Sequence, residues 1–350
     1  MKEIIVKENE AGQRLDKLLH KILPQASSGF LYKMLRKKNI TWNGKKADGS
    51  EKTAVGDKIC FFLAEETFAK FAGQEAAASQ AAGMKTAEYR KAYASLKGIR
   101  VLYENPHVVL LHKPSGILSQ KAEPGDLSLN EWLIGYLLEK GILQQEELVT
   151  FRPSICNRLD RNTSGIVICG ISLTGSQRMN TLLKERSVHK FYRLMVQGRM
   201  PAEAYLDGYL YKDEAVNKVQ ILSKEKYERL ASEQKKLYSR IETAYRAIQE
   251  LSFEKAGTAT LLEVELITGK THQIRAHLSS VGHPLLGDYK YGNRAWNELF
   301  RKEYGISSQL LHACRIEFPQ MEEPLAAMSH LILTDEMPPV YERLLRDGKR

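Results

Sequence analysis

Apolar residues in the first sixty positions recur with helical and then with strand spacing. The pattern predicts an amphipathic helix over residues 14–23 that ends at Pro24. Its apolar side chains follow i, i+3, i+4, i+7 spacing: Leu15, Leu18, Leu19 and Ile22. Ser27 or Ser28 can cap a second helix, which carries Phe30, Leu31, Met34 and Leu35. Alternation then leads into Asn43-Gly44, a strong hairpin-turn signal, and residues 55–63 predict a closing strand.

After an alanine-rich segment, the pattern becomes richer in strands. We predict strands over residues 101–103, 107–112, 166–169, 191–196, 241–251 and 260–267. Helices are predicted over residues 173–183 and in a charged surface insertion over 224–236. Strands and helices do not alternate as in βαβ units, so we expect an α+β fold with a mixed, largely antiparallel sheet and flanking helices. The expected organisation is a small domain over 1–63, a linker over 64–98 that is partly helical and partly flexible, and a large domain over 99–350.

Positive charge is concentrated in the small domain. The 350-residue chain has 52 Lys and Arg against 42 Asp and Glu, a net charge of +10. Residues 1–63 contribute 13 basic against 7 acidic side chains. The second helix and the hairpin carry a basic group consisting of Lys33, Arg36, Lys37, Lys38 and Lys45. This pattern favours contacts with nucleic-acid phosphates over the alternative, a merely solvated surface.

The sequence argues against several classes of protein. No apolar run is long enough to span a membrane, and the start of the chain lacks a secretory segment. Four cysteines without a CxxC pair indicate a reduced, cytoplasmic protein. Phosphate-loop, dinucleotide-binding, zinc-deaminase and serine-hydrolase motifs are absent, so we expect no nucleotide cofactor. His272 and His277 are five residues apart, which does not fit a helical metal site, and we expect both to be packed and hydrogen-bonded.

The densest group of polar residues is the segment 157–165, Asn-Arg-Leu-Asp-Arg-Asn-Thr-Ser-Gly, just before a buried strand. Asp160 lies between two arginines, whose charge favours the ionised carboxylate. Such a group could attack an electrophilic carbon or stabilise a developing cation. From the local pattern alone, a simple turn capped by Asp160 is an equal alternative.

Two further segments carry candidate chemistry. In residues 268–278, a helix that begins near Thr271 would direct Arg275 toward an anion, either a phosphate or Asp160. In residues 189–193, Lys190 and Tyr192 are interleaved on a strand, an arrangement that can stack a base and hold its phosphate. Tyrosines on strands are, however, more often core residues.

Taken together, these segments resemble a known family. Residues 157–165 are similar to the active-site signature of the RluA-type pseudouridine synthases, usually His-Arg-Leu-Asp-Arg-x-Thr-Ser-Gly. Residues 268–291 resemble the second long signature of that family. Lys-Pro-Ser-Gly at 113–116, the Lys190/Tyr192 pair and Leu-His-Ala at 311–313 also fall in the family's order. The likeness covers residues 99 to about 335, and residues 12–63 are similar to the RNA-binding domain named after ribosomal protein S-four.

The resemblance implies the pseudouridine synthase fold and an isomerase that converts uridine in RNA to pseudouridine without a cofactor or metal. It implies that Asp160 is the essential aspartate, Arg275 its partner, Tyr192 the residue that stacks on the base, and Arg158 the side chain that fills the space of the flipped nucleotide. Lys190 is expected to bind the substrate as well. Asn157 replaces the usual His, and His112 stands before Lys113 where Asp or Asn is commoner, which affects the expected hydrogen bonding of the loop.

The expected partner is RNA, and the enzyme is expected to act as a monomer in the cytoplasm. A front RNA-binding domain suits a large structured substrate, so large-subunit ribosomal RNA is the first expectation and transfer RNA the alternative. A non-catalytic RNA-binding ribosome assembly factor would fit the basic small domain equally well. A metal-dependent nuclease would need a carboxylate cluster, which the sequence does not contain.

Overall fold

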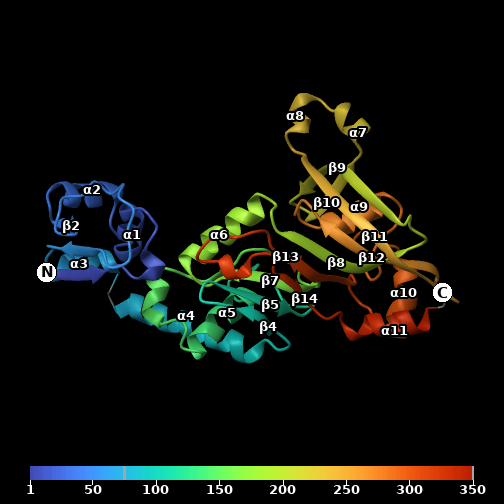
Figure 1. Ribbon diagram of the computed structural model, residues 1–350, viewed down its shortest axis with the longest axis horizontal. Helices are drawn as coiled ribbons and strands as arrows, with labels where there is room; N and C mark the ends of the chain where they lie inside the picture. Colours follow the sequence, from blue (N-terminus) through green and yellow to red (C-terminus); the bar gives the residue numbers. More distant parts are fainter. Residues whose placement is uncertain (74–75, 349–350) are drawn as a thin grey trace.

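The computed structural model describes residues 1–73 and 76–348, which form a small amino-terminal unit and a larger unit around one wide sheet (Figure 1). The units meet where the side-chain oxygen of Asn9, in the short helix η1 (Glu8–Glu10), accepts a 3.3 Å hydrogen bond from the Leu173 amide. None of the helices within the described ranges is both long and apolar enough to cross a membrane.

The small unit packs two helices against a three-stranded antiparallel sheet. The strand order is β1 (Lys2–Ile5), β3 (Lys58–Phe61), β2 (Ile40–Trp42), and the helices are α1 (Leu15–Ile22) and α2 (Ser28–Arg36). All four apolar positions predicted for the first helix are buried. The Ser27 hydroxyl accepts a 3.3 Å hydrogen bond from the Phe30 amide and so caps α2. Both predicted helices are therefore confirmed.

The predicted turn at Asn43-Gly44 is confirmed, but the strand pairing around it differs from that of a simple hairpin. Both residues have positive φ, 50° and 71°, and Trp42 and Lys45 exchange backbone hydrogen bonds of 3.0 and 2.9 Å across them. This is the geometry of a two-residue hairpin turn. After the turn, only Lys45 pairs with β2, through an isolated bridge to Trp42. Along its length, β2 pairs instead with the later strand β3.

The segment between the units is helical where it is described. In α3 (Glu65–Ala72), Phe68 is buried within the apolar core of the small unit. In α4 (Ala76–Ser95), Tyr89 belongs to the main core of the large unit. A Cβ on Gly135 in α5 (Leu129–Glu139) would lie 2.2 Å from the Tyr89 carbonyl oxygen, so α4 and α5 pack closely. Residues 74 and 75 of the expected linker lie outside the described residues, and the domain boundaries stay a prediction.

The large unit is built on an eleven-stranded sheet with the main order β10-β9-β11-β12-β8-β13-β7-β5-β4. Strand β14 pairs with β13, and β6 pairs with β7. The strands are β4 (Arg100–Glu104), β5 (Val108–Lys113), β6 (Ser154–Ile155), β7 (Ser164–Gly170), β8 (His189–Gln197), β9 (Glu203–Asp213), β10 (Lys218–Leu222), β11 (Ser239–Phe253), β12 (Gly257–Leu266), β13 (Leu311–Glu317) and β14 (Ile332–Thr334). Among the strand pairs of the described residues, only β13 and β7 run parallel. The expected α+β fold with a largely antiparallel sheet is confirmed.

Helices cover both faces of this sheet because its central strands are apolar on both sides. In β7, Val167 and Cys169 join the core that contains α5, whereas Ile166 and Ile168 join a second core on the other face with Met179 of α6. The remaining helices are α6 (Leu173–Lys184), α9 (Gln273–Ser280), α10 (Arg294–Tyr304) and α11 (Pro339–Asp347), with short helices η2 (Gln145–Val149) and η3 (Ala326–Met328).

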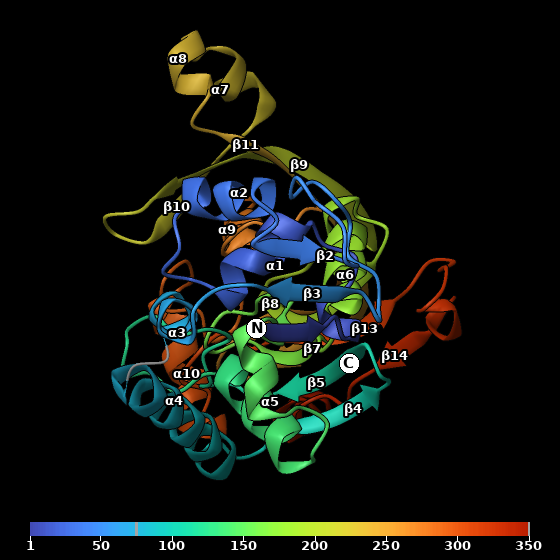
Figure 2. The same ribbon diagram turned by 90° about the vertical axis from the view of Figure 1, so that its left-hand side faces the viewer.

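The charged insertion forms two short helices, α7 (Lys224–Glu228) and α8 (Ser232–Lys235), that project beyond the sheet in both views (Figures 1 and 2). The ring of Tyr227 stacks on Tyr209 of β9, with centroids 3.6 Å apart and planes 3° from parallel. Tyr238 lies near Tyr211 of the same strand, at 5.5 Å between centroids. These ring contacts anchor the predicted surface insertion to the sheet.

Candidate active site

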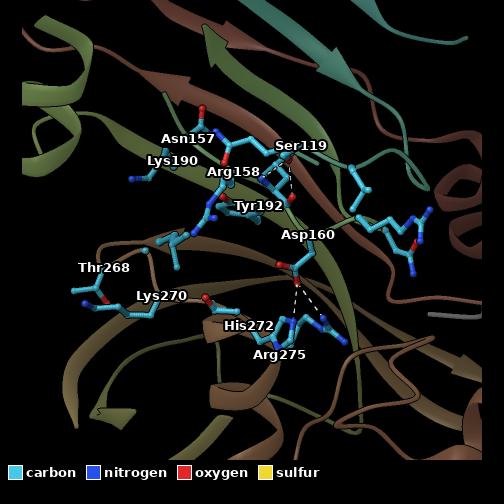
Figure 3. A pocket seen from close by; sticks show the side chains of 18 of the residues that line it. Ser119, Asn157, Arg158, Asp160, Lys190, Tyr192, Thr268, Lys270, His272 and Arg275 are labelled. Carbon is cyan, nitrogen blue, oxygen red and sulfur yellow. Dashed lines mark hydrogen bonds and ion pairs between the residues drawn. The ribbon is translucent and has the colours of Figure 1, made fainter. Parts of the chain in front are cut away.

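A cavity of about 1010 Å³ lies beside the loop that precedes β7 (Figure 3). Its lining includes residues 118–122 after β5, the loop at 156–162, and residues 266–272 between β12 and α9. The end of α6 and the start of β8 contribute further side chains. The cavity therefore brings together all three segments in which the sequence placed candidate chemistry.

The loop that carries Asp160 is tied down on both sides of that residue. On one side, the Ser119 hydroxyl donates to the Leu159 carbonyl oxygen at 2.7 Å and accepts from the Leu159 amide at 3.0 Å. On the other side, the Gly116 amide donates to the Arg161 carbonyl oxygen at 2.9 Å. These contacts fix the backbone, so the Asp160 side chain points into the cavity from a defined position (Figure 3).

Lys113 supports the same loop from within the protein. Its side chain is fully buried, and its ammonium group donates to the carbonyl oxygens of Pro114, Ile117 and Arg161 at 3.1, 2.8 and 3.0 Å. Three carbonyl acceptors match the three N–H donors of an ammonium group. Burial lowers the pKa of Lys113 to about 7, and the negative charge of Asp160 opposes this shift.

Arg275 contacts Asp160 from α9, on the opposite wall. Its Nη1 lies 3.0 Å from Oδ2 of Asp160, and the arginine side chain is only 8% exposed. The sequence left open whether Arg275 would meet a phosphate or Asp160, and in the structure it contacts Asp160. Arg275 also donates to Asp288, from Nε to Oδ2 at 2.7 Å and from Nη2 to Oδ1 at 3.0 Å. Burial alone would raise the pKa of Asp288, but the hydrogen bonds and charge of Arg275 lower it.

Tyr192, Lys190 and Arg158 also line the cavity. Tyr192 is 5% exposed, and burial together with the charge of Asp160 raises the pKa of its hydroxyl, which is therefore protonated at neutral pH. Burial and the nearby charge of Arg186 lower the pKa of Lys190. All five residues predicted for catalysis and substrate binding thus lie around one cavity, although their roles stay predictions.

The lining is strongly cationic. Within the described residues, Asp160 is the one Asp or Glu side chain that lines the cavity. The basic side chains are Lys121, Arg158, Arg161, Lys184, Arg186, Lys190, Lys212, Lys270, Arg275 and Lys290. Such a lining attracts a polyanion and focuses its phosphates near the single carboxylate.

The predicted basic group of the small unit is separate from the cavity. Lys33, Arg36, Lys37 and Lys38 are exposed at the end of α2, and Lys45 is exposed at the Asn43-Gly44 turn. None of these five side chains lines the cavity. Within the described parts of the chain, no group of three or more His, Cys, Asp or Glu side chains is arranged to hold a metal ion.

The two histidines of α9 differ in their surroundings. His277 is buried, and its Nδ1 lies 3.0 Å from the Thr243 hydroxyl, away from the cavity. His272 is hydrogen-bonded as well, at 2.9 Å to the Tyr291 hydroxyl, but it also lines the cavity. Hydrogen-bonded packing is thus confirmed for both, while the position of His272 near Asp160 was not expected from the sequence.

The two departures from the family signature have definite partners. Asn157 Oδ1 accepts a 2.7 Å hydrogen bond from the Ile168 amide, so this side chain joins the loop to β7. Nδ1 of His112 contacts Asp335, which also forms an ion pair with Arg100. Asp288 was not among the residues predicted from the sequence, although it lies inside the second signature. Ser119 was not predicted either, and no pattern in the sequence marks it.

Comparisons with known proteins agree with this geometry. Residues 107–280 match the family model described as RNA pseudouridylate synthase. The chain is 28% identical to the ribosomal large subunit pseudouridine synthase C of Vibrio cholerae, over 92% of this chain and 90% of the relative. It is 27% identical to the ribosomal large subunit pseudouridine synthase D of Nitrosomonas europaea, over 96% of this chain and 85% of the relative.

The fold also matches a solved structure. Human RNA pseudouridylate synthase domain containing 4 superposes with a TM-score of 0.54 at 22% identity, over 75% of this chain and 98% of the human chain. The family match spans the loop with Asp160, strand β8 with Tyr192, and helix α9 with Arg275. The chain therefore belongs to the RNA pseudouridine synthase family and is an isomerase.

Proposed function

We propose that this enzyme isomerises specific uridines of large-subunit ribosomal RNA, with Asp160 as the catalytic carboxylate. The observation that carries the proposal is the position of Asp160, the one acidic side chain in the described lining of a cationic cavity, 3.0 Å from the buried Arg275. Relatives named ribosomal large subunit pseudouridine synthase match over about nine-tenths of this chain, which supports the proposed substrate.

The proposed reaction needs only a carboxylate and proton transfers. The N1–C1′ bond of uridine breaks, the base turns, and the C5–C1′ bond forms. C5 loses its proton and N1 gains one, so the product is an isomer and no electrons or groups are exchanged with a cofactor. Asp160 either attacks the ribose or stabilises the intermediate. Arg275 orients the Asp160 carboxylate through its 3.0 Å hydrogen bond.

The other cavity residues are proposed to hold the flipped nucleotide. Tyr192 is almost fully buried, so its ring offers a fixed surface for stacking of the uracil. Its hydroxyl is protonated at neutral pH, so it would donate a hydrogen bond to the uracil rather than take up the C5 proton. Arg158 would fill the space that the nucleotide leaves, which offsets part of the unstacking cost of a few kcal/mol. Lys190, which lines the same cavity, would contact a phosphate.

We further propose that residues 1–63 form an S-four-type RNA-binding domain joined by the linker 64–98 to the catalytic domain, 99–350. The small unit has its own core, which extends to Phe68 of α3, and an exposed basic group, and both support a separate amino-terminal domain. Replacing Lys33, Arg36, Lys37 and Lys38 by Ala should weaken RNA binding. It should also reduce the salt slope, the slope of the logarithm of the binding constant against the logarithm of the salt concentration, by up to about 4. A matched variant with Lys91, Lys97, Lys255 and Lys302 replaced has the same net charge and should keep the slope. Equal slopes in both variants would contradict the assignment.

The activity and the substrate are tested together by release of tritium from RNA labelled at uridine C5. Ribosomal RNA of the large subunit and transfer RNA are supplied separately at equal uridine concentration. Release from ribosomal RNA alone supports the proposal, whereas release from transfer RNA alone reassigns the substrate. Tight RNA binding without release from either RNA would favour the alternative, a ribosome assembly factor.

We propose that the enzyme acts as a monomer in the cytoplasm. One chain supplies all five proposed site residues, and Cys60, Cys156, Cys169 and Cys314 are free thiols, as a reducing compartment allows. Light scattering during gel filtration should give a mass near 39.8 kDa over a range of enzyme concentrations. A mass of twice this value at assay concentration would contradict the monomer.

A further inference from the structure

His272 has an unusual backbone conformation at the edge of the cavity. It caps the start of α9 with φ 54° and ψ 16°, in the left-handed region that residues with a Cβ rarely adopt. Its side chain is 10% exposed, and its Nε2 lies 3.9 Å from Oδ2 of Asp160, beside Arg275 (Figure 3). Strained conformations of this kind persist where the surrounding structure enforces them, often at functional sites.

The hydrogen bonds of Tyr291 favour one position for the proton on the His272 ring. The Val219 amide donates to the Tyr291 hydroxyl oxygen at 3.0 Å, and Nδ1 of His272 lies 2.9 Å from the same oxygen. A phenol has one proton to donate. Within the described residues, Nδ1 of His272 is the one group bonded to this hydroxyl that can accept it. This pairing favours Nδ1 as the acceptor and, in the neutral ring, a proton on Nε2.

The charges around His272 favour the neutral ring. Burial is the largest influence and lowers the pKa of His272, while the negative charge of Asp160 opposes this. The positive charges of Arg275 and Lys290 lower the pKa further, and Asp288 opposes them. The net direction is downward, so at neutral pH the ring is an uncharged donor at Nε2.

We propose that His272 is a positioning residue for Asp160, held by Tyr291 in the tautomer that presents Nε2–H to the carboxylate. His272 caps the start of α9 and Arg275 lies in its first turn, and the side chains of both approach Oδ2 of Asp160. A shift of about 1 Å would bring Nε2 of His272 within hydrogen-bond distance of Asp160. In the other tautomer a nitrogen lone pair would face the carboxylate and repel it. The consequence for catalysis rests on the proposed function, whereas the tautomer does not.

The tautomer is tested without substrate, by long-range ¹H–¹⁵N NMR correlation of the full-length protein labelled in histidine. The His272 signals are identified by their absence in His272→Gln. We expect the Nε2–H pattern in the wild type and a mixture of tautomers in Tyr291→Phe, which has no hydroxyl proton to donate. An Nδ1–H pattern or a charged ring in the wild type at pH 7.5 would overturn the inference.

The positioning role is tested by single-turnover rates on the RNA that gives tritium release. His272→Leu removes the donor and should lower the rate about tenfold or more, with RNA affinity unchanged. His272→Gln places an amide N–H near the position of Nε2 and should restore the rate to within about threefold of the wild type. His277→Gln is the matched control on the same helix, because His277 faces Thr243, and it should leave the rate unchanged.

A double-mutant cycle separates positioning from packing. Tyr291→Phe should lower the wild-type rate but have no further effect in His272→Leu, since the two residues act through one hydrogen bond. Additive effects, or a fully active His272→Leu, would overturn the positioning role while leaving the proposed function intact. An inactive wild type would instead refute the proposed function, and the NMR experiment would still report the tautomer.

Discussion

Asp288 holds Arg275 by two parallel hydrogen bonds, Nε to Oδ2 at 2.7 Å and Nη2 to Oδ1 at 3.0 Å. The Asp288 carboxylate is fully buried and also accepts from the amides of Lys290 and Tyr291. With two of its nitrogens held in this way, Arg275 can direct only Nη1 at Asp160. A buried carboxylate behind the site therefore sets the direction of the guanidinium in front of it.

Asp288→Asn should damage both stability and catalysis. The variant keeps the size of the side chain but leaves the buried guanidinium without its main counter-charge, which costs about 3–5 kcal/mol when one partner of a buried pair is removed. We expect a free energy of unfolding lower by this order and a single-turnover rate lower by about tenfold or more. Urea unfolding and tritium release measure the two effects. Glu254→Gln, an exposed change of the same charge, should alter neither.

Lys113 should make stability depend on pH in an identifiable way. Its pKa is about 7 in the folded protein and 10.5 in the reference state, so between these values the unfolded chain binds more protons. The free energy of unfolding therefore rises with pH, by about 2 kcal/mol between pH 7 and pH 9 from this group alone. Below about pH 6 the contribution no longer changes, because Lys113 is then protonated in both states.

Lys113→Met removes this titration and keeps most of the side-chain volume. Urea unfolding of the wild type and of the variant at pH 7, 8 and 9 measures the difference in slope. If the free energy of unfolding rises with pH in the wild type but not in the variant, the titration belongs to Lys113. Identical pH dependence in the two proteins would assign the titration to other groups.

Thr163 carries a buried hydroxyl without a partner. It is 2% exposed, and its Oγ1 has no hydrogen bond within the described structure. An unsatisfied buried hydroxyl is destabilising, so Thr163→Val should raise the free energy of unfolding by about 1 kcal/mol. Thr243→Val is the matched control, because the Thr243 hydroxyl bonds His277 and Gln273. It should lower stability by about 1–3 kcal/mol. Loss of stability in both variants would mean that Thr163 is satisfied in solution.

Local patterns in the sequence were enough to predict elements whose structure depends on neighbouring residues along the chain. The apolar spacing from Leu15 to Ile22 and the cap at Ser27 predicted α1 and α2, and the Asn43-Gly44 turn was also found. In contrast, α5 was missed because apolar side chains are buried on most sides of it, which leaves no polar face to reveal its period. Strand β9 was missed as well; in it only Gly208 and Leu210 are buried, and most of its other residues are half-buried.

For the site, the sequence identified the residues that line the cavity but not the contacts that hold them in place. Asp160 and Arg275 lie in recognisable segments, although the pattern alone left open whether Arg275 meets a phosphate or Asp160. The contact of Lys113 with the Arg161 carbonyl joins positions 48 residues apart, and no local pattern encodes such a contact. The orientation of His272 likewise depends on Tyr291 and on the amide of Val219 in a distant strand.

The central claim, that Asp160 carries out the isomerisation, is tested most directly by Asp160→Asn in a single-turnover assay. The amide keeps the shape of the side chain and removes its charge, so RNA should bind with an affinity within about threefold of the wild type. Pseudouridine formation should be slower on the order of a thousandfold or more, because the group that acts on the ribose is lost. Pseudouridine formed by the variant within about tenfold of the wild-type rate would contradict the account.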